Sequence, residues 1–230
     1  MCWCINAIRE DEMYSVDVMD TRIKHPFTAL VAGPTGCGKT QFVTKLLKHH
    51  DSVVDKPFQK IVWCYGEYQV GYAAMARDMP FVQLHEGIPS NMESLFDRGS
   101  TNLIILDDLM SQATKDERVA HLFTKGSHHR NLSVIVILQN LFHQGKESRT
   151  ISLNAHYMVL FKNPRDSSQI THLAKQIYPQ NGQFLQEAYK DATSKPYGYL
   201  FIDLKPDTDE QLRLRSKIFP GEENLVYVMK

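Results

Sequence analysis

Eight residues, at positions 33–40, constrain this sequence more than any other part of it. They read Gly-Pro-Thr-Gly-Cys-Gly-Lys-Thr, which fits the pattern of a glycine, four residues of any kind, then glycine, lysine and serine or threonine. An apolar run at 27–32 precedes them, and apolar residues at 42, 43, 46 and 47 follow at helical spacing. The eight residues therefore lie between an expected strand and an expected helix, which is where a phosphate-binding loop is found.

The spacing within this segment, called the phosphate loop below, has a direct physical reason. Its glycines allow backbone angles that side chains forbid, so the loop can turn its N–H groups toward phosphate at the positive end of a helix dipole. We expect Lys39 to reach the β- and γ-phosphates of ATP, and the Thr40 hydroxyl to be a ligand of Mg²⁺. The residues expected to bind the nucleotide are Gly33, Pro34, Thr35, Gly36, Cys37, Gly38, Lys39 and Thr40.

Length and charge narrow the class of protein. A chain of 230 residues without a Gly/Ser- or Pro-rich linker favours one sizeable α/β domain, and we expect an ATPase domain at 25–230 preceded by an N-terminal arm at 1–24. Lys and Arg together number 26, as do Asp and Glu, so the formal net charge is zero. A globally basic surface for nucleic acid is therefore excluded, and any DNA contact must come from local patches or from assembly.

Two further observations bear on where such a protein works. No apolar stretch approaches the roughly 20 residues of a membrane span, so we expect no membrane partner. The four cysteines do not form a disulfide framework, since one lies inside the phosphate loop and another in an expected buried strand. We expect an intracellular protein, in the cytoplasm or nucleus, rather than a secreted one.

Apolar runs alternate with helical segments along most of the chain, which favours a mainly parallel central sheet with helices on both faces. Near the end, apolar residues at 212, 214 and 218 alternate with basic ones, and this predicts an antiparallel edge hairpin. The expected fold is thus the α/β fold of a P-loop NTPase. Strands are expected at 60–65, 81–85, 102–107, 132–138, 157–161, 197–204 and 212–218, and helices at 72–79, 91–96, 119–123, 167–177 and 182–191.

Two carboxylates, Asp107 and Asp108, end one of the expected buried strands. In phosphate-loop enzymes an acid at this point holds Mg²⁺, directly or through water, so Asp107 is the expected metal residue. A second carboxylate beside it can orient or deprotonate the attacking water, which is the role expected for Asp108. Many such ATPases have Glu there, and because Asp is one methylene shorter, either the geometry adapts or turnover is slow.

Gln139 ends the next strand, which in a sheet of this order runs beside the phosphate loop. Its amide can both donate and accept, so we expect it to sense the γ-phosphate or position water. Hydrolysis also needs a positive charge on the transition state, often an arginine from a neighbouring subunit. Arg130, just before this strand, is the expected residue, with Arg149 and Arg165 as alternatives.

The order of these motifs resembles the FtsK–HerA superfamily of DNA-pumping ATPases. The resemblance rests on the phosphate loop, the segments 103–108 and 134–139, and Asn154 before the next strand, and it covers roughly residues 25 to 228. The compact length, together with His-Pro-Phe at 25–27 and Leu-Lys-Pro at 204–206, is similar to the genome-packaging ATPases of poxviruses, other large DNA viruses and Polinton or adintovirus-like elements.

This resemblance implies a homo-oligomeric ring, with a hexamer as the expected size, that hydrolyses ATP and threads double-stranded DNA through its centre. A capsid or portal protein is the implied partner, and the virion or virus factory the implied location. It also assigns the sensor role to Gln139 and the catalytic acid to Asp108.

Two alternatives remain open at this point. A small-molecule or nucleotide kinase also uses a phosphate loop, although such kinases usually carry arginine-rich lid segments after the core. A nucleotide-dependent assembly module with little turnover is the other alternative, against which the intact Lys39, Asp107 and Gln139 argue.

Overall fold

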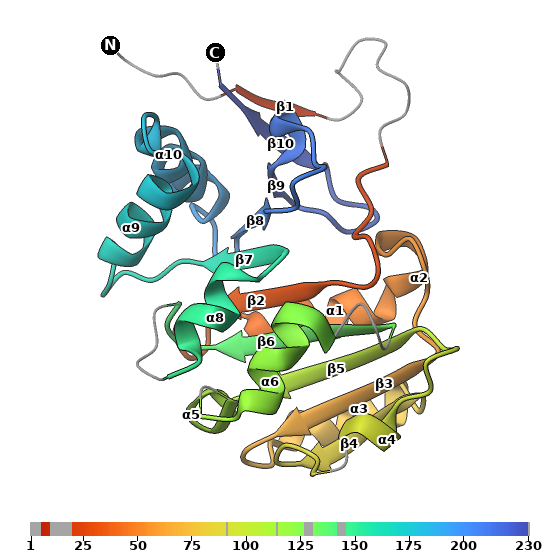
Figure 1. Cartoon of the computed structure of the whole chain (residues 1–230). Coiled ribbons are helices and arrows are strands. Elements are labelled where there is room, and N and C mark those ends of the chain that lie inside the picture. The colour runs from red at the N-terminus through yellow and green to blue at the C-terminus, as the bar shows by residue number, and fades with distance from the viewer. Residues whose placement is uncertain are drawn as a thin grey trace.

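A single sheet runs through the computed structural model, and ten strands of the described residues take part in it (Figure 1). The structure describes residues 6–9, 20–90, 92–113, 115–126, 131–141 and 146–229. In chain order the strands are β1 (Asn6–Arg9), β2 (Thr28–Ala32), β3 (Lys60–Tyr65), β4 (Val82–Glu86), β5 (Asn102–Asp107), β6 (Leu132–Leu138), β7 (Tyr157–Phe161), β8 (Tyr199–Asp203), β9 (Leu214–Ser216) and β10 (Leu225–Val228).

Across the sheet the strands follow the order β1-β10-β9-β8-β7-β2-β6-β5-β3-β4. The pairs from β7 to β4 are parallel, and β8, β9, β10 and β1 extend the sheet by antiparallel pairing. The expected parallel sheet with an antiparallel C-terminal edge is confirmed. The edge is wider than the predicted hairpin, because β10 pairs with β9 and then with β1 from the other end of the chain.

Helices cover both faces of the sheet, as the apolar runs predict; in Figure 1, α6 and α8 lie in front of the strands, and α1 and α3 behind them. The helices are α1 (Lys39–Lys48), α2 (His50–Val53), α3 (Val70–Asp78), α4 (Met92–Leu95), α5 (Met110–Ala113), α6 (Glu117–His121), α8 (Ser148–Leu153), α9 (Ser168–Ile177) and α10 (Gly182–Ala192), with a π-helical turn (Leu122–Gly126) and a 3₁₀ turn (Glu210–Leu212).

Each face of the sheet has its own hydrophobic core. Along β2, Ala29 and Val31 join the core beneath α1, α2 and α3, whereas Leu30 and Ala32 join the core beneath α6, α8, α9 and α10. Successive side chains of a strand point to opposite faces, so a strand covered on both sides is apolar at most positions. This explains why the central strands read as continuous apolar runs rather than as alternating ones.

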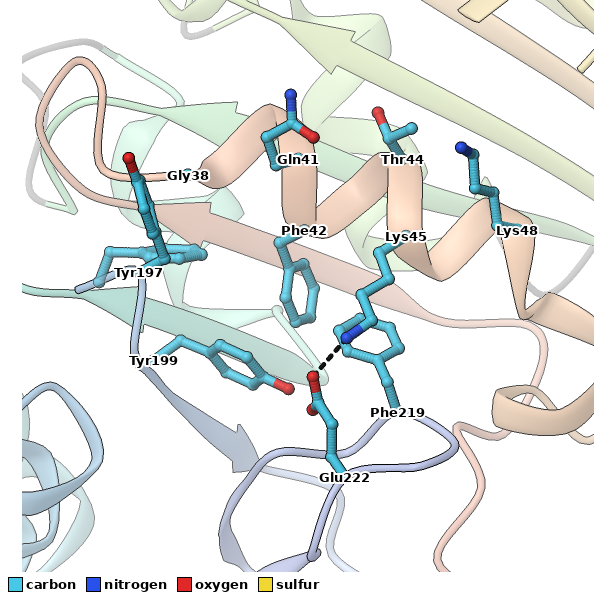
Figure 2. A pocket seen from close by; sticks show the side chains of 11 residues that line it. Gly38, Gln41, Phe42, Thr44, Lys45, Lys48, Tyr197, Tyr199, Phe219 and Glu222 are labelled. Carbon is cyan, nitrogen blue, oxygen red and sulfur yellow. Dashed lines mark hydrogen bonds and ion pairs between the residues drawn. The ribbon is translucent and has the colours of Figure 1, made fainter. Parts of the chain in front are cut away.

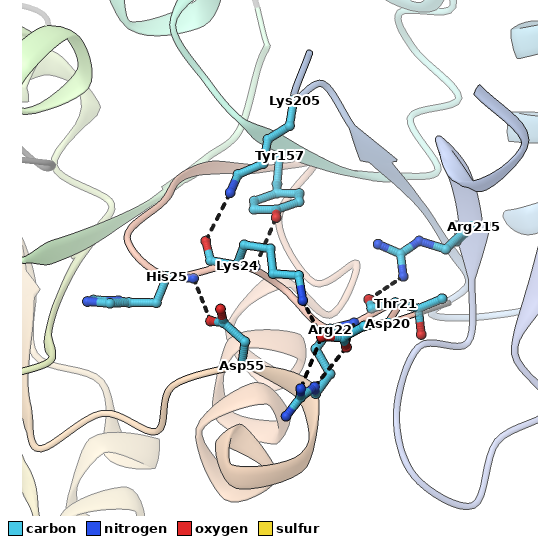
Figure 3. A network of polar contacts seen from close by, with 9 residues as sticks. All are labelled: Asp20, Thr21, Arg22, Lys24, His25, Asp55, Tyr157, Lys205 and Arg215. Carbon is cyan, nitrogen blue, oxygen red and sulfur yellow. Dashed lines mark hydrogen bonds and ion pairs between the residues drawn. The ribbon is translucent and has the colours of Figure 1, made fainter. Parts of the chain in front are cut away.

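A network of polar contacts holds the chain before β2 against the body of the protein (Figure 3). Lys24 N donates to the Tyr157 hydroxyl (3.0 Å), His25 N donates to Asp55 Oδ1 (2.7 Å), and Lys205 Nζ donates to the Lys24 carbonyl (3.3 Å). The segment 204–206 therefore meets the chain at Lys24, directly before the segment 25–27 and near the amino end of β2. This end of the strand is opposite the phosphate loop, so the network anchors β2 away from the loop that follows it.

No helix among the residues that the structure describes has both the length and the apolar character needed to cross a membrane.

Candidate functional site

The phosphate loop joins the end of β2 to the start of α1, as the sequence predicts. Gly36 and Gly38 have φ angles of 79° and 106°, in the left-handed region that favours glycine. Gly33 is required for a different reason. A Cβ atom there would lie 2.7 Å from both the Cβ of Phe161 and the Sγ of Cys37, so a side chain would not fit between the loop and β7.

Lys39 is the first residue of α1, and its side chain folds over the loop. The Nζ atom donates hydrogen bonds to the carbonyl oxygens of Gly33 (2.7 Å) and Pro34 (2.9 Å). The amino group thus lies inside the curve of the loop, beside the backbone N–H groups at the positive end of the α1 dipole. This is a concentration of positive charge and donors suited to a polyphosphate.

Thr40 and Asp107 meet across the site although they come from different elements. Thr40 Oγ1 lies 3.5 Å from Asp107 Oδ2, at the carboxyl end of β5. Among the described residues no three His, Cys, Asp or Glu side chains gather closely enough to bind a metal ion by themselves. A hydroxyl and one carboxylate do fit Mg²⁺, which proteins commonly hold through one or two side chains, with phosphate oxygens and water as the other ligands. Thr40 and Asp107 would hold the ion.

Asp107 is buried, with 3% of its surface exposed, and Tyr72 is its second partner. The Tyr72 hydroxyl, on α3, donates to Asp107 Oδ2 over 2.9 Å. Burial raises the pKa of the Asp107 carboxyl above its ordinary value, and the hydrogen bond from Tyr72 opposes that shift. The charge of Asp108 raises the pKa further, whereas the charge of Lys39 lowers it. Tyr72 therefore helps to keep a buried carboxylate ionised and oriented toward Thr40.

Asp108 follows β5 directly and is exposed, unlike its neighbour. Its φ angle is 56°, a left-handed conformation that non-glycine residues seldom adopt, Asp and Asn being more tolerant of it than most. The chain turns away from the sheet at this residue, so the two carboxylates lie in different environments. The expected division of roles, with Asp107 for the metal and Asp108 for the water, stays a prediction, and this difference in burial agrees with it.

Gln139 is the residue after β6, and the sheet order confirms that β6 lies beside β2. Gly33 N donates to the carbonyl oxygen of Leu138 (3.2 Å), so the end of β6 is bonded to the start of the loop. Gln139 and Gly33 line the same small cavity, of about 20 Å³. Because β6 also pairs with β5, Gln139 comes between the loop and the strand that carries Asp107.

The arginine expected to act on the transition state, Arg130, lies outside the described residues. The two alternatives are described and exposed: Arg149 is in the first turn of α8, and Arg165 follows β7. The structure thus brings Asp107 to Thr40 and the end of β6 to the loop, while the role of Gln139 and the source of the arginine stay predictions.

Tyr72 is a residue that the sequence reasoning missed. It lies in a helix that the sequence predicts, but nothing in its spacing singles it out from other buried aromatic residues. Only the pairing of β3 with β5, which places α3 over the end of β5, brings its hydroxyl to Asp107.

The substitution Tyr72→Phe tests this contact. Without the hydroxyl, the pKa of Asp107 is expected to rise, since a hydrogen bond that stabilises the charged form is lost. A higher pKa means that fewer Asp107 side chains are ionised in acid, so the Mg²⁺ concentration for half-maximal nucleotide hydrolysis should rise by about threefold to tenfold at acid pH and by less at alkaline pH. Magnesium titrations at both pH values measure this.

Tyr68→Phe is the matched control, because Tyr68 packs against Tyr72 but is 60% exposed. If Tyr72→Phe and the control need the same Mg²⁺ concentration at both pH values, the contact has no part in metal binding.

Comparisons with known proteins bear on the fold. The sequence matches no protein-family model and no curated protein. Among solved structures, the genome packaging NTPase B204 from Sulfolobus turreted icosahedral virus 2, in complex with ATP-gammaS, matches with a TM-score of 0.54 at 14% identity, covering 83% of this chain and 96% of that one.

The same protein in complex with AMPPCP gives a TM-score of 0.54 at 14% identity, over 79% of this chain and 94% of that one. The DNA-packaging ATPase B204 from Sulfolobus turreted icosahedral virus gives 0.52 at 13% identity, over 78% and 94%. At sequence identities this low, structural similarity supports a statement about the fold alone. The chain has the fold of a P-loop NTPase.

Proposed function

We propose that this chain is an ATP-hydrolysing motor that moves double-stranded DNA in the packaging of a viral genome. The observation that carries the proposal is the convergence of three separate elements on one point. Lys39 folds over the phosphate loop, Asp107 lies 3.5 Å from Thr40, and Gln139 follows β6, the strand between β2 and β5. The likeness to a packaging NTPase solved with ATP-gammaS and AMPPCP supports the choice of ATP.

The residues divide the work of hydrolysis as follows. Lys39 and the loop N–H groups bind the triphosphate and stabilise the charge that grows on the γ-phosphate. Thr40 and Asp107 would hold Mg²⁺, which would supply positive charge to offset that of the triphosphate. Gln139 orients a water, and Asp108 takes its proton as the oxygen attacks phosphorus and the bond to the β-phosphate oxygen breaks.

The proposed movement of DNA rests on the structural neighbours and on the order of the motifs. The neighbours are named as genome-packaging and DNA-packaging enzymes, and the order of motifs resembles the FtsK–HerA superfamily. Because the formal net charge is zero, DNA binding would depend on local patches that assembly brings together. We propose a homo-oligomeric ring, hexameric and of the poxvirus or Polinton type, with Arg130 supplied to the neighbouring subunit and a capsid or portal protein as partner.

Hydrolysis in the presence of DNA tests the proposal. The rate of phosphate release is expected to rise about tenfold or more with linear double-stranded DNA, because an arginine supplied in trans contributes strongly once subunits are aligned. Native mass measurement of the same samples should show a ring. The control is a single-stranded DNA of equal length, which should stimulate less.

Other outcomes point elsewhere. Equal turnover by a monomer with and without DNA would contradict the motor. Tight ATP binding with no phosphate release would favour the assembly module, and transfer of phosphate to a nucleoside monophosphate would favour the kinase.

A further inference from the structure

A cavity of about 660 Å³ borders the phosphate loop on the side of β8 (Figure 2). It begins at Gly38, the last glycine of the loop, and extends along α1 as far as Lys48. Its volume lies within the range of small-ligand sites, which are about 300–1,000 Å³. Apart from Gly38, the residues that line it have no role in the site proposed above, which leaves most of this cavity without a function.

Five of the eleven residues that line the cavity are aromatic. They are Phe42, Phe161, Tyr197, Tyr199 and Phe219. Three of these pack tightly on one another: Phe42 lies 4.8 Å from Tyr199 and 5.1 Å from Phe219, measured between ring centroids. Such walls suit a flat, aromatic ligand.

The far end of the cavity is held in place by an ion pair. Lys45, on α1, pairs with Glu222, and its Nζ atom lies 4.7 Å from the centroid of the Phe219 ring. Figure 2 shows Glu222 reaching from the C-terminal segment toward Lys45. The C-terminal segment is therefore joined to α1 at this end of the cavity.

Tyr197 differs from the other aromatic residues of the cavity, because 72% of its surface is exposed. Its φ angle is 61°, and a bulky residue in the left-handed region is a conformational outlier of the kind that gathers at functional sites. The turn is fixed by Gly198, whose N–H donates to the Lys195 carbonyl over 3.1 Å. The turn thus fixes the place where the exposed ring leaves the backbone.

That place is the end of the phosphate loop. A Cβ atom built on Gly38 would lie 3.1 Å from Cδ1 of Tyr197, so the ring lies against the loop backbone. Tyr197 also lines a second cavity, of about 320 Å³, together with Gly36 and Cys37. The ring therefore borders the loop along several residues.

The two sides of the loop set the direction of a bound nucleotide. Asp107 and Gln139 lie on the β6 and β5 side, which is where the γ-phosphate must be for hydrolysis. The base and ribose must then extend to the other side of the loop, toward β7 and β8, where the aromatic cavity begins. We infer that this cavity receives the base and ribose of the nucleotide, and that the base stacks on Tyr197. The inference rests on the proposed ATP site and assigns its base-binding part.

Binding of two ligands tests the inference. ATP and inorganic tripolyphosphate share the phosphate chain, but only ATP has a base. Calorimetry with Mg²⁺ should show that Tyr197→Ala weakens ATP binding about tenfold, since the base loses the ring on which it stacks, while tripolyphosphate binding stays unchanged. Tyr197→Phe keeps the ring and should bind ATP as the original protein does.

Leu153→Ala, at a residue 63% exposed on α8, is the control for loss of an exposed apolar side chain, and melting temperatures check that each variant is folded. Unchanged ATP affinity in Tyr197→Ala, or equal losses for both ligands, overturns the base site while leaving ATP hydrolysis intact. If the original protein binds neither ligand, the proposed function and the base site both fail.

Discussion

Lys39→Ala is expected to lower the rate of ATP hydrolysis by about 10²–10³-fold, the loss typical when one group that stabilises transition-state charge is removed. Lys39 Nζ lies within the curve of the loop, where it is held by the carbonyl oxygens of Gly33 and Pro34. The truncated side chain cannot reach the γ-phosphate. Phosphate release at saturating ATP and Mg²⁺ measures the effect.

The control for this substitution is Lys175→Ala, which removes an exposed lysine from the last turn of α9, away from the loop. It should retain full activity and the same melting temperature. Hydrolysis by Lys39→Ala at more than about a tenth of the original rate would contradict the assignment, because a residue of this kind is expected to contribute at least tenfold.

Asp107→Asn is expected to lower hydrolysis by about 10²-fold or more, because an amide is a poor ligand for Mg²⁺ and the ion's contribution is several kcal/mol. The same substitution should stabilise the fold at neutral pH. The new amide would keep an oxygen to accept from Tyr72, but it would carry no charge in a position where only 3% of the surface is exposed. Activity and stability should therefore move in opposite directions.

The stability effect has a definite pH dependence. Burial raises the folded-state pKa of Asp107 above its ordinary value of 3.8, so between those two pKa values the folded state binds more protons than the unfolded state. The free energy of unfolding contributed by this group therefore falls as the pH rises through that window. Melting temperatures of Asp107→Asn and of the original protein should differ least in acid and most above the folded pKa.

Asp207→Asn, at an exposed position, controls for loss of a carboxylate from the surface and should show neither effect. A lower melting temperature for Asp107→Asn at neutral pH, together with full activity, would mean that the carboxylate has a structural role instead.

Local patterns were enough to predict most of this fold. The apolar run within β6 specifies a strand, because a strand buried on both faces is apolar at most positions. The octet after β2 specifies the turn from that strand to a helix. The sequence predicts that the strand ending at Gln139 runs beside the phosphate loop, and the sheet confirms that β6 lies between β2 and β5.

Long-range contacts account for what the sequence did not predict. The strands β1 and β10 are four residues each. Among the described residues, β1 pairs with β10, and β10 also pairs with β9. Tyr72 reaches Asp107 because β3 pairs with β5, and Tyr197 reaches Gly38 from a turn far along the chain. No local pattern marks these tyrosines, since their roles depend on which elements the fold places side by side.

A structure determined with Mg²⁺ and a slowly hydrolysed ATP analogue tests the central claim most directly. In that structure the γ-phosphate is expected to lie beside Lys39 and the ion between Thr40 and Asp107. The Gln139 amide is expected within hydrogen-bonding distance of the γ-phosphate or its attacking water. A nucleotide bound elsewhere, or a γ-phosphate remote from Asp107 and Gln139, would contradict it.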